Sequence, residues 1–169
     1  ERVKAEKAQR LAAEQAARQA AEVDFSADSY GTLPMNQSQE RTGTKFSSIA
    51  DIHPDRDGQE IVMHARLQTS RAPSAKLVFL TFRQNVHCVQ ATLAQTPERV
   101  SRQMTKWAAS VTPESLVRVE GTISRVPKPI ESASVTVKDA EVKINKMHIL
   151  VPVTYDGQLP FYVDDATRS

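Results

Sequence analysis

The segment that most constrains the fold is Leu77–Arg83, with the sequence LVFLTFR. It is rich in β-branched and aromatic residues, contains no Gly or Pro, and follows the turn-like segment Ala72–Ala75. This combination predicts a β-strand. Because alternate side chains of a strand point to opposite faces, one face of this strand can form a core wall made of Val78, Leu80 and Phe82.

The other face of the same strand carries Phe79, Thr81 and Arg83. An aromatic ring beside a phosphate-seeking cation is typical of β-barrels that bind single-stranded nucleic acid. The alternative is that a second layer covers this face and Phe79 packs within it. The strand alone leaves both interpretations open.

Two further strands flank this one. The segment Glu60–Arg71 alternates, which predicts a half-buried strand and a hairpin with Leu77–Arg83, with its apolar face formed by Ile61, Met63, Ala65 and Leu67. The segment Val86–Ala94 predicts a third strand, in which Gln90 points away from Val89 and Ala91.

A helix is predicted next, with Thr96 as the N-cap, Pro97 in the first position and Glu98 in the first turn. At helical spacing its apolar face contains Val100, Met104, Trp107 and Ala108. We expect Trp107 to be a core residue rather than a ligand platform. Another side of the helix is basic and contains Arg99, Arg102 and Lys106.

Two strands follow the helix. Ser115–Val126 contains Gly121, which predicts a bend or bulge, and Ser134–Val153 places Val142 and Ile144 on the inside. The order of three strands, a helix and two strands predicts a mainly β fold, a five-stranded closed barrel of the OB type with the helix between strands 3 and 4.

The composition of the remaining segments divides the chain into four parts. We expect a helical extension and linker in 1–29, a lead-in in 30–58, the barrel in 59–153, and a connector toward a missing domain in 154–169. Because the chain begins with Glu1 rather than Met, we expect it to be part of a longer protein. The first segment has high helix propensity but no wide apolar stripe. Its basic side is either a contact for an RNA backbone or a solvated face, and consists of Lys4, Lys7 and Arg10.

Several classes of function lack support. A single cysteine, Cys88, excludes an internal disulfide and a Cys-based zinc site. The four histidines show no metal-ligand spacing, and the chain contains neither a Gly-rich phosphate loop nor a nucleophile elbow. No apolar run approaches the roughly 20 residues needed to span a bilayer. We therefore expect no catalytic residue, metal or cofactor in this chain and no membrane partner.

The charge distribution points to a polyanionic partner. Residues 60–110 carry seven basic and two acidic side chains, although the whole chain has a net charge of only +2. The positive excess thus lies on the segment that contains the aromatic strand.

Several motifs resemble the N-terminal anticodon-binding barrel of eukaryotic cytosolic aspartyl-tRNA synthetases, in particular the fungal branch. The resemblance extends over residues 30–169 in both order and spacing. It rests on Tyr30–Pro34 (YGTLP), Gln37-Ser38, Arg71, Leu77–Gln84 (LVFLTFRQ), Val89-Gln90, Met104–Ala108 (MTKWA), Glu114–Gly121 (ESLVRVEG) and Pro129–Ser134 (PIESAS).

The resemblance implies a set of site residues. Phe79 matches an aromatic that stacks on the central anticodon uridine, Arg71 matches an arginine that contacts the loop, and Gln90 matches a glutamine that bonds a base edge. Ser132 and Glu141 match a serine and a glutamate after the fourth strand, although the segment between them is slightly longer than the family pattern. With these neighbours in view we favour the stacking interpretation of Phe79, with discrimination by Gln90 and Glu141.

The resemblance also implies the activity of the parent protein, a class II aspartate–tRNA ligase that uses ATP and Mg²⁺, is cytoplasmic and forms a homodimer. Its catalytic domain is absent here, so we expect no activity from this chain alone. The Ala-rich segment 1–22 departs from the family's lysine-rich extension. Two alternatives remain: the equivalent barrel of a lysyl- or asparaginyl-tRNA synthetase, and a barrel that binds protein rather than tRNA-Asp.

Overall fold

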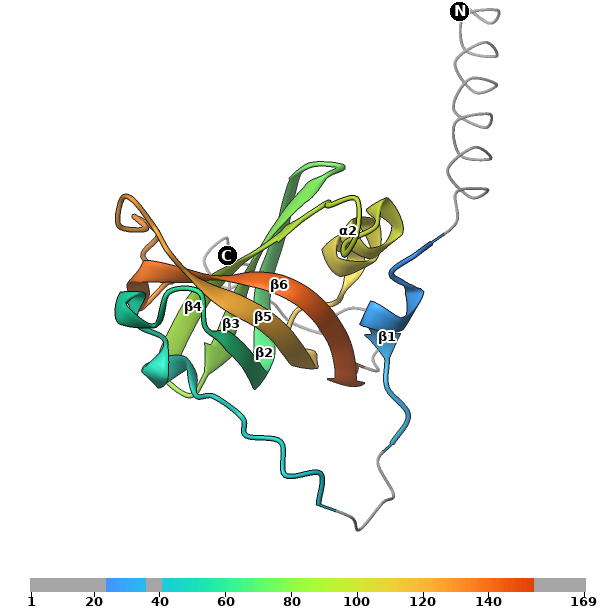
Figure 1. Ribbon diagram of the computed structural model, residues 1–169, viewed down its shortest axis with the longest axis horizontal. Coiled ribbons are helices and arrows are strands. Elements are labelled where there is room, and N and C mark those ends of the chain that lie inside the picture. Colours follow the sequence, from blue (N-terminus) through green and yellow to red (C-terminus); the bar gives the residue numbers. More distant parts are fainter. Residues whose placement is uncertain (1–23, 36–40, 154–169) are drawn as a thin grey trace, which may run out of the picture.

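The computed structural model describes residues 24–35 and 41–153, which form a strongly curved β-sheet with one α-helix at its side (Figure 1). Short 3₁₀ turns occur at η1 (Ala27–Ser29), η2 (Ile49–Asp51) and η3 (Pro54–Arg56). The other elements are β1 (Tyr30–Thr32), β2 (Glu60–Ser74), β3 (Leu77–Gln84), β4 (His87–Ala94), α2 (Arg102–Ser110), β5 (Leu116–Arg125) and β6 (Val137–Val151).

Strands β2 to β6 close into a barrel. The antiparallel pairs β2–β3, β3–β4, β2–β5 and β5–β6 are completed by a parallel pairing of β4 with β6. The helix α2 lies between the third and fourth barrel strands, so the predicted OB-type barrel is confirmed. Strand β1, from the lead-in, adds a parallel sixth strand to β6. The helical extension expected before residue 24 lies outside the described residues.

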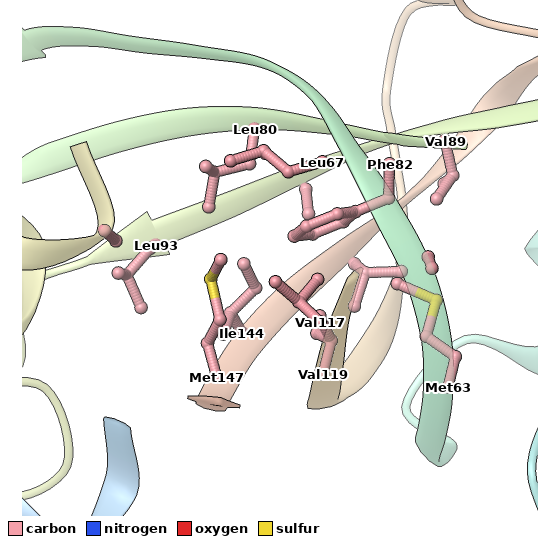
Figure 2. Close-up of a cluster of buried hydrophobic side chains, with 14 of the residues drawn as sticks. Met63, Leu67, Leu80, Phe82, Val89, Leu93, Val117, Val119, Ile144 and Met147 are labelled. Atoms are coloured by element: carbon pink, nitrogen blue, oxygen red, sulfur yellow. The ribbon is translucent and has the colours of Figure 1, made fainter. Parts of the chain in front are cut away.

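The barrel interior is an apolar core in which side chains from all five strands meet (Figure 2). Each such side chain contributes about 1.5–3 kcal/mol when it is fully buried, so these strands hold one another in register. The predicted inward sets of the barrel strands are all buried, namely Ile61, Met63, Ala65, Leu67, Val78, Leu80, Phe82, Val89, Ala91, Val142 and Ile144.

The predicted start of the helix is wrong. Thr96 instead forms an isolated β-bridge with Val100, and its hydroxyl accepts a hydrogen bond from the Val100 amide (3.1 Å). The helix begins at Arg102 and is capped by Ser101, whose hydroxyl accepts from the Met104 amide (3.1 Å). The hydroxyls of Thr96 and Ser101 thus both accept from a backbone amide, but only Ser101 caps the helix.

The hairpin between the first two barrel strands also differs from expectation. Strand β2 continues to Ser74, which pairs with Leu77, so only Ala75 and Lys76 form the turn. The segment Ala72–Ser74, predicted as part of a turn, therefore extends a ribbon that projects beside α2 (Figure 1).

The amide of Gln84 closes the free edge of β2. Its nitrogen donates to the carbonyl of His64 (3.2 Å), and its oxygen accepts from the Ser48 hydroxyl and the Ile49 amide (both 2.9 Å). The segment before the barrel is thereby fixed against the strand edge, and Ile49 is fully buried.

The lead-in docks on α2 through Tyr30. The Tyr30 ring lies 5.1 Å from the ring of Trp107, which is half-buried rather than the full core residue expected. The Tyr30 hydroxyl donates to the carboxylate of Asp24, and the Ser26 hydroxyl donates to that of Ser101 (2.6 Å). Burial, followed by the hydrogen bond to Asp24 and the charge of that residue, raises the pKa of Tyr30 to about 12.

Gly121 generates the first testable prediction. The predicted irregularity is present, since the β5–β6 register shifts between Glu120 and Gly121. A β-carbon at position 121 would lie 2.4 Å from the carbonyl oxygen of Lys143 and 2.9 Å from Cγ1 of Val142. We expect Gly121→Ala to lower the free energy of unfolding by about 1–3 kcal/mol through overpacking, as measured by urea denaturation. Ser124→Ala on the same strand is the control, and an equal effect of both would contradict the explanation.

Tyr30 generates a prediction on pH. In the unfolded chain a tyrosine has a pKa of about 10, whereas that of Tyr30 in the folded protein is about 12. Tyr30 therefore contributes its full stabilisation below about pH 10, and this contribution is lost as the pH rises toward about 12. The difference in unfolding free energy between wild type and Tyr30→Phe should therefore be constant from neutral pH to about 9 and shrink above about 10. A difference that stays constant across this range would contradict the assigned Tyr30–Asp24 contact.

Candidate nucleic-acid interface

The outer face of β2, β3 and β4 brings three of the predicted site residues into two adjacent rows. Residues that are directly opposite in a sheet point to the same side. Arg71, Phe79 and Thr92 form the first row. Thr69, Thr81 and Gln90 form the second. Arg71, Phe79 and Gln90 thus share one surface, on the opposite side of the strands from the core.

Arg71 reaches this surface because of an irregularity in β2. Strict alternation from Leu67, which is fully buried, would place Arg71 inside the barrel. The register shifts between Leu67 and Thr69, so that Gln68 is an extra residue and the following side chains change face. After this bulge Thr69 and Arg71 are exposed and Ser70 is half-buried.

Arg71 and Phe79 form a cation–π pair, with the Cζ atom of the guanidinium 5.6 Å from the ring centroid. The ring is half-buried and the arginine is exposed. The guanidinium lies over the face of the ring, so the pair combines an aromatic surface with a positive charge that can attract a phosphate.

Gln90 supplies unsatisfied polar groups beside this pair. Within the described part of the chain its side chain forms no hydrogen bond, although it is only half-exposed. It lies opposite Thr81, where the pairing of β4 with β6 is irregular between Val89 and Ala91. A primary amide offers donors and an acceptor, which is what recognition of a base edge requires.

Glu141 and Ser132 come from β6 and from the loop before it. Glu141 is half-buried on β6, opposite Ser124, and directly precedes Val142, which pairs with Ala91 next to Gln90. Ser132 is exposed in the loop between β5 and β6. Backbone bonding of Thr136 to Cys88 (3.0 Å) attaches this loop to β4. The structure shows no hydrogen bond from Glu141 or Ser132 to Arg71, Phe79 or Gln90.

Arg83 shares the face but differs electrostatically from Arg71. Its Nη2 lies 2.8 Å from Oε2 of Glu114, and both side chains are about one-third exposed, at 36% and 33%. Because this charge is already paired, Arg83 would have to exchange a carboxylate for any phosphate. Arg71 forms no ion pair with a described carboxylate.

One candidate was not selected from the sequence. Lys143 on β6 is exposed and pairs with Thr92, so it continues the row of Arg71 and Phe79. Its outward direction follows from the inward Val142 and Ile144, but its position beside β4 depends on a parallel pairing that local pattern does not reveal.

A second aromatic cluster lies on the part of the outer surface formed by β2, β5 and β6. Phe46 and His64 have ring centroids 4.0 Å apart, and Cζ of Arg118 lies 6.0 Å from the Phe46 ring. Burial and, next, the charge of Arg118 lower the pKa of His64. Here the phenyl ring already has a ring partner, in contrast to Phe79.

Other kinds of site receive no support from the described residues. They contain no group of three or more His, Cys, Asp and Glu side chains placed to hold a metal. In the same part of the chain, no helix is long and apolar enough to cross a membrane. The candidate backbone contacts Lys4, Lys7 and Arg10 lie outside the described residues.

Comparison with known proteins identifies the relatives of this chain. No protein-family model matches it. It is 36% identical over 145 residues to a protein of Bos taurus that is named cytoplasmic aspartate–tRNA ligase. The aligned residues make up 86% of this chain and 28% of the relative. The chain therefore spans little more than a quarter of that protein.

Solved structures agree with this. An aspartyl-tRNA synthetase from Entamoeba histolytica superposes with a TM-score of 0.73 at 27% identity, over 82% of this chain and 28% of that one. An asparaginyl-tRNA synthetase from Pyrococcus horikoshii, at 22% identity, shares the fold with a TM-score of 0.54 over 71% of this chain and 26% of its own. Over 86% of its length, this chain is a homologue of one segment of the eukaryotic cytosolic aspartyl-tRNA synthetases, and it has their OB-type barrel.

Proposed function

We propose that this chain is the tRNA anticodon-binding module of a cytosolic aspartate–tRNA ligase. The outer face of β2, β3 and β4 receives the anticodon loop of tRNA-Asp. The observation that carries the proposal is the Arg71–Phe79 pair, 5.6 Å apart, beside the unbonded amide of Gln90 on one exposed surface. The homology to aspartyl-tRNA synthetases supports the choice of RNA.

The two parts of this surface have different tasks. Stacking of a base on Phe79 contributes affinity, but it tolerates any base because every base has a π-face. Directional hydrogen bonds must therefore select the base, and Gln90 and Glu141 supply donors and acceptors for splayed anticodon bases. Ser132 adds a hydroxyl from the loop, and Arg71 adds a charge for the RNA backbone.

The chemistry belongs to the longer protein. In this proposal the parent is a class II ligase that joins aspartate to tRNA-Asp with ATP and Mg²⁺, works in the cytoplasm and is a homodimer. Lys4, Lys7 and Arg10 add a loose contact to the RNA backbone. The role of this chain is selection, since the anticodon it reads decides which tRNA reaches the catalytic domain.

Two alternatives predict different behaviour. A lysyl- or asparaginyl-type barrel would also read a central uridine but would prefer the other bases of its own anticodon. A barrel that docks protein through an apolar interface would show little salt dependence, whereas RNA binding weakens steeply with added salt. The polar side chains in the two rows around Phe79 favour RNA binding over an apolar protein interface.

Phe79 provides the direct test. We expect Phe79→Ala to weaken binding of an anticodon stem-loop of tRNA-Asp by about 1–3 kcal/mol through the loss of one base stack. Phe79→Trp should retain most of the affinity. Binding is measured by fluorescence anisotropy at two salt concentrations, with the melting temperature of each variant as a check on folding.

The matched control is Phe46→Ala. Phe46 is also a phenyl ring beside an arginine and is 49% exposed, but it packs on His64 away from β3 and β4. Equal losses of affinity for the two alanine variants would contradict a specific role of Phe79.

Gln90 provides the test of specificity. Replacing it with alanine should reduce the preference for uridine at the central anticodon position by about 1–3 kcal/mol, because a buried base edge loses its partner. The measurement compares stem-loops with U, C, A or G at that position, for wild type and Gln90→Ala. A uniform loss over all four RNAs would indicate a contact to the backbone instead.

A further inference from the structure

A groove lies between α2 and the projecting hairpin of β2 and β3, on the other side of the hairpin from the Phe79 surface. Its volume is about 450 Å³. The hairpin contributes Ala72, Ser74, Ala75 and Val78, and α2 contributes Arg102, Thr105, Lys106 and Ala109. Figure 1 shows the helix beside this ribbon.

Two hydrogen bonds join the walls of the groove, and neither involves the side chain of Arg102 or Lys106. The Thr105 hydroxyl donates to the carbonyl of Ala75 (3.0 Å), and the Ser70 hydroxyl donates to that of Ala108 (3.5 Å). These bonds fix α2 to the hairpin at two points. Arg102 and Lys106, one turn apart on the helix, therefore stand on a fixed wall.

The charge of the groove has one sign. Lys106 is exposed and Arg102 is half-buried, and among the described residues no acidic side chain lines the groove. Neither cation forms an ion pair with a carboxylate in residues 24–35 or 41–153. Two unpaired cations above a floor of small side chains are complementary to a narrow, negatively charged chain rather than to a bulky apolar one.

The groove and the proposed interface lie on opposite sides of the same hairpin. Ala72 follows Arg71, and Val78 precedes Phe79, so one hairpin separates the groove from the stacking surface. Lys76, at the tip of this hairpin, is exposed. A strand that leaves the Phe79 surface around the hairpin would meet positive charge on the way into the groove.

We infer that the groove binds the sugar–phosphate backbone of the same RNA strand whose bases lie on Phe79, with Arg102 and Lys106 each holding a phosphate. This inference rests on the proposed function, because it assigns a second contact to the RNA of that site. It gives a role to Arg102 and Lys106, whereas Arg99, predicted on the same side of the helix, lies before α2 and outside the groove. The contact adds affinity without sequence preference.

The test is the salt dependence of binding. For single-stranded RNA, each phosphate contact contributes about 0.7 to the slope of log affinity against log salt. The double variant Arg102→Gln/Lys106→Gln should therefore show a slope that is shallower by about 1.4. The probe is the anticodon stem-loop of tRNA-Asp, and the variant should weaken binding of stem-loops with all four central bases by the same factor.

The control removes the same charge elsewhere. Lys45→Gln/Lys146→Gln replaces two exposed lysines, one before Phe46 and one on β6 opposite Glu120, both outside the groove. If the slopes of the two double variants are equal while Phe79→Ala loses affinity as predicted, the groove inference is overturned and the proposed function stands. If the wild type binds no stem-loop, both fall together.

A second measurement assigns the contact to individual phosphates. Single methylphosphonate substitutions in the stem-loop remove one negative charge at a time. At a phosphate in the groove, the substitution should weaken binding to the wild type but not to Arg102→Gln/Lys106→Gln. If every methylphosphonate weakened binding to the wild type and to the double variant by the same factor, the groove would hold none of the phosphates.

Discussion

The structure depends on the double pairing of the longest early strand. β2 pairs with β5 over its first half and with β3 over its second, and its apolar residues Ile61, Met63, Ala65 and Leu67 lie inside the barrel. The bulge at Gln68 lies where one partner replaces the other. It lets the strand bend around the core, and it also turns Arg71 outward beside Phe79. The place of Arg71 in the candidate site is thus a consequence of one extra residue.

Much of the fold could be predicted because it depends on local patterns. Alternation in Ile61–Leu67 and Val78–Phe82 identified the inward faces, and Gly121 marked an irregularity that the structure places against Lys143. The start of the helix was predicted wrongly because Thr96 and Ser101 are both good caps, and burial of Ser101 against Ser26 decides between them. That contact joins residues 75 positions apart, which no local rule reveals.

The candidate site was predicted only in part, for the same reason. The outward direction of Phe79 and Gln90 follows from alternation, whereas that of Arg71 contradicts it and came from family resemblance. The bulge had no signal in the segment around Gln68. Lys143 was known to point outward, but not to lie beside Thr92, because the parallel pairing of β4 and β6 brings together distant segments. The irregular pairing beside Gln90 involves β6 residues between Ser132 and Glu141, the segment that the resemblance predicts to be longer than the family pattern.

The central claim is that RNA binds to the outer face of β2, β3 and β4. The most direct measurement is a map of backbone amide chemical shifts of this chain during titration with the anticodon stem-loop of tRNA-Asp. We expect the largest changes at Arg71, Phe79 and Gln90 and little change at His64, Arg118 and His148. Changes centred on the latter three would place the interface on β2, β5 and β6 and contradict the account.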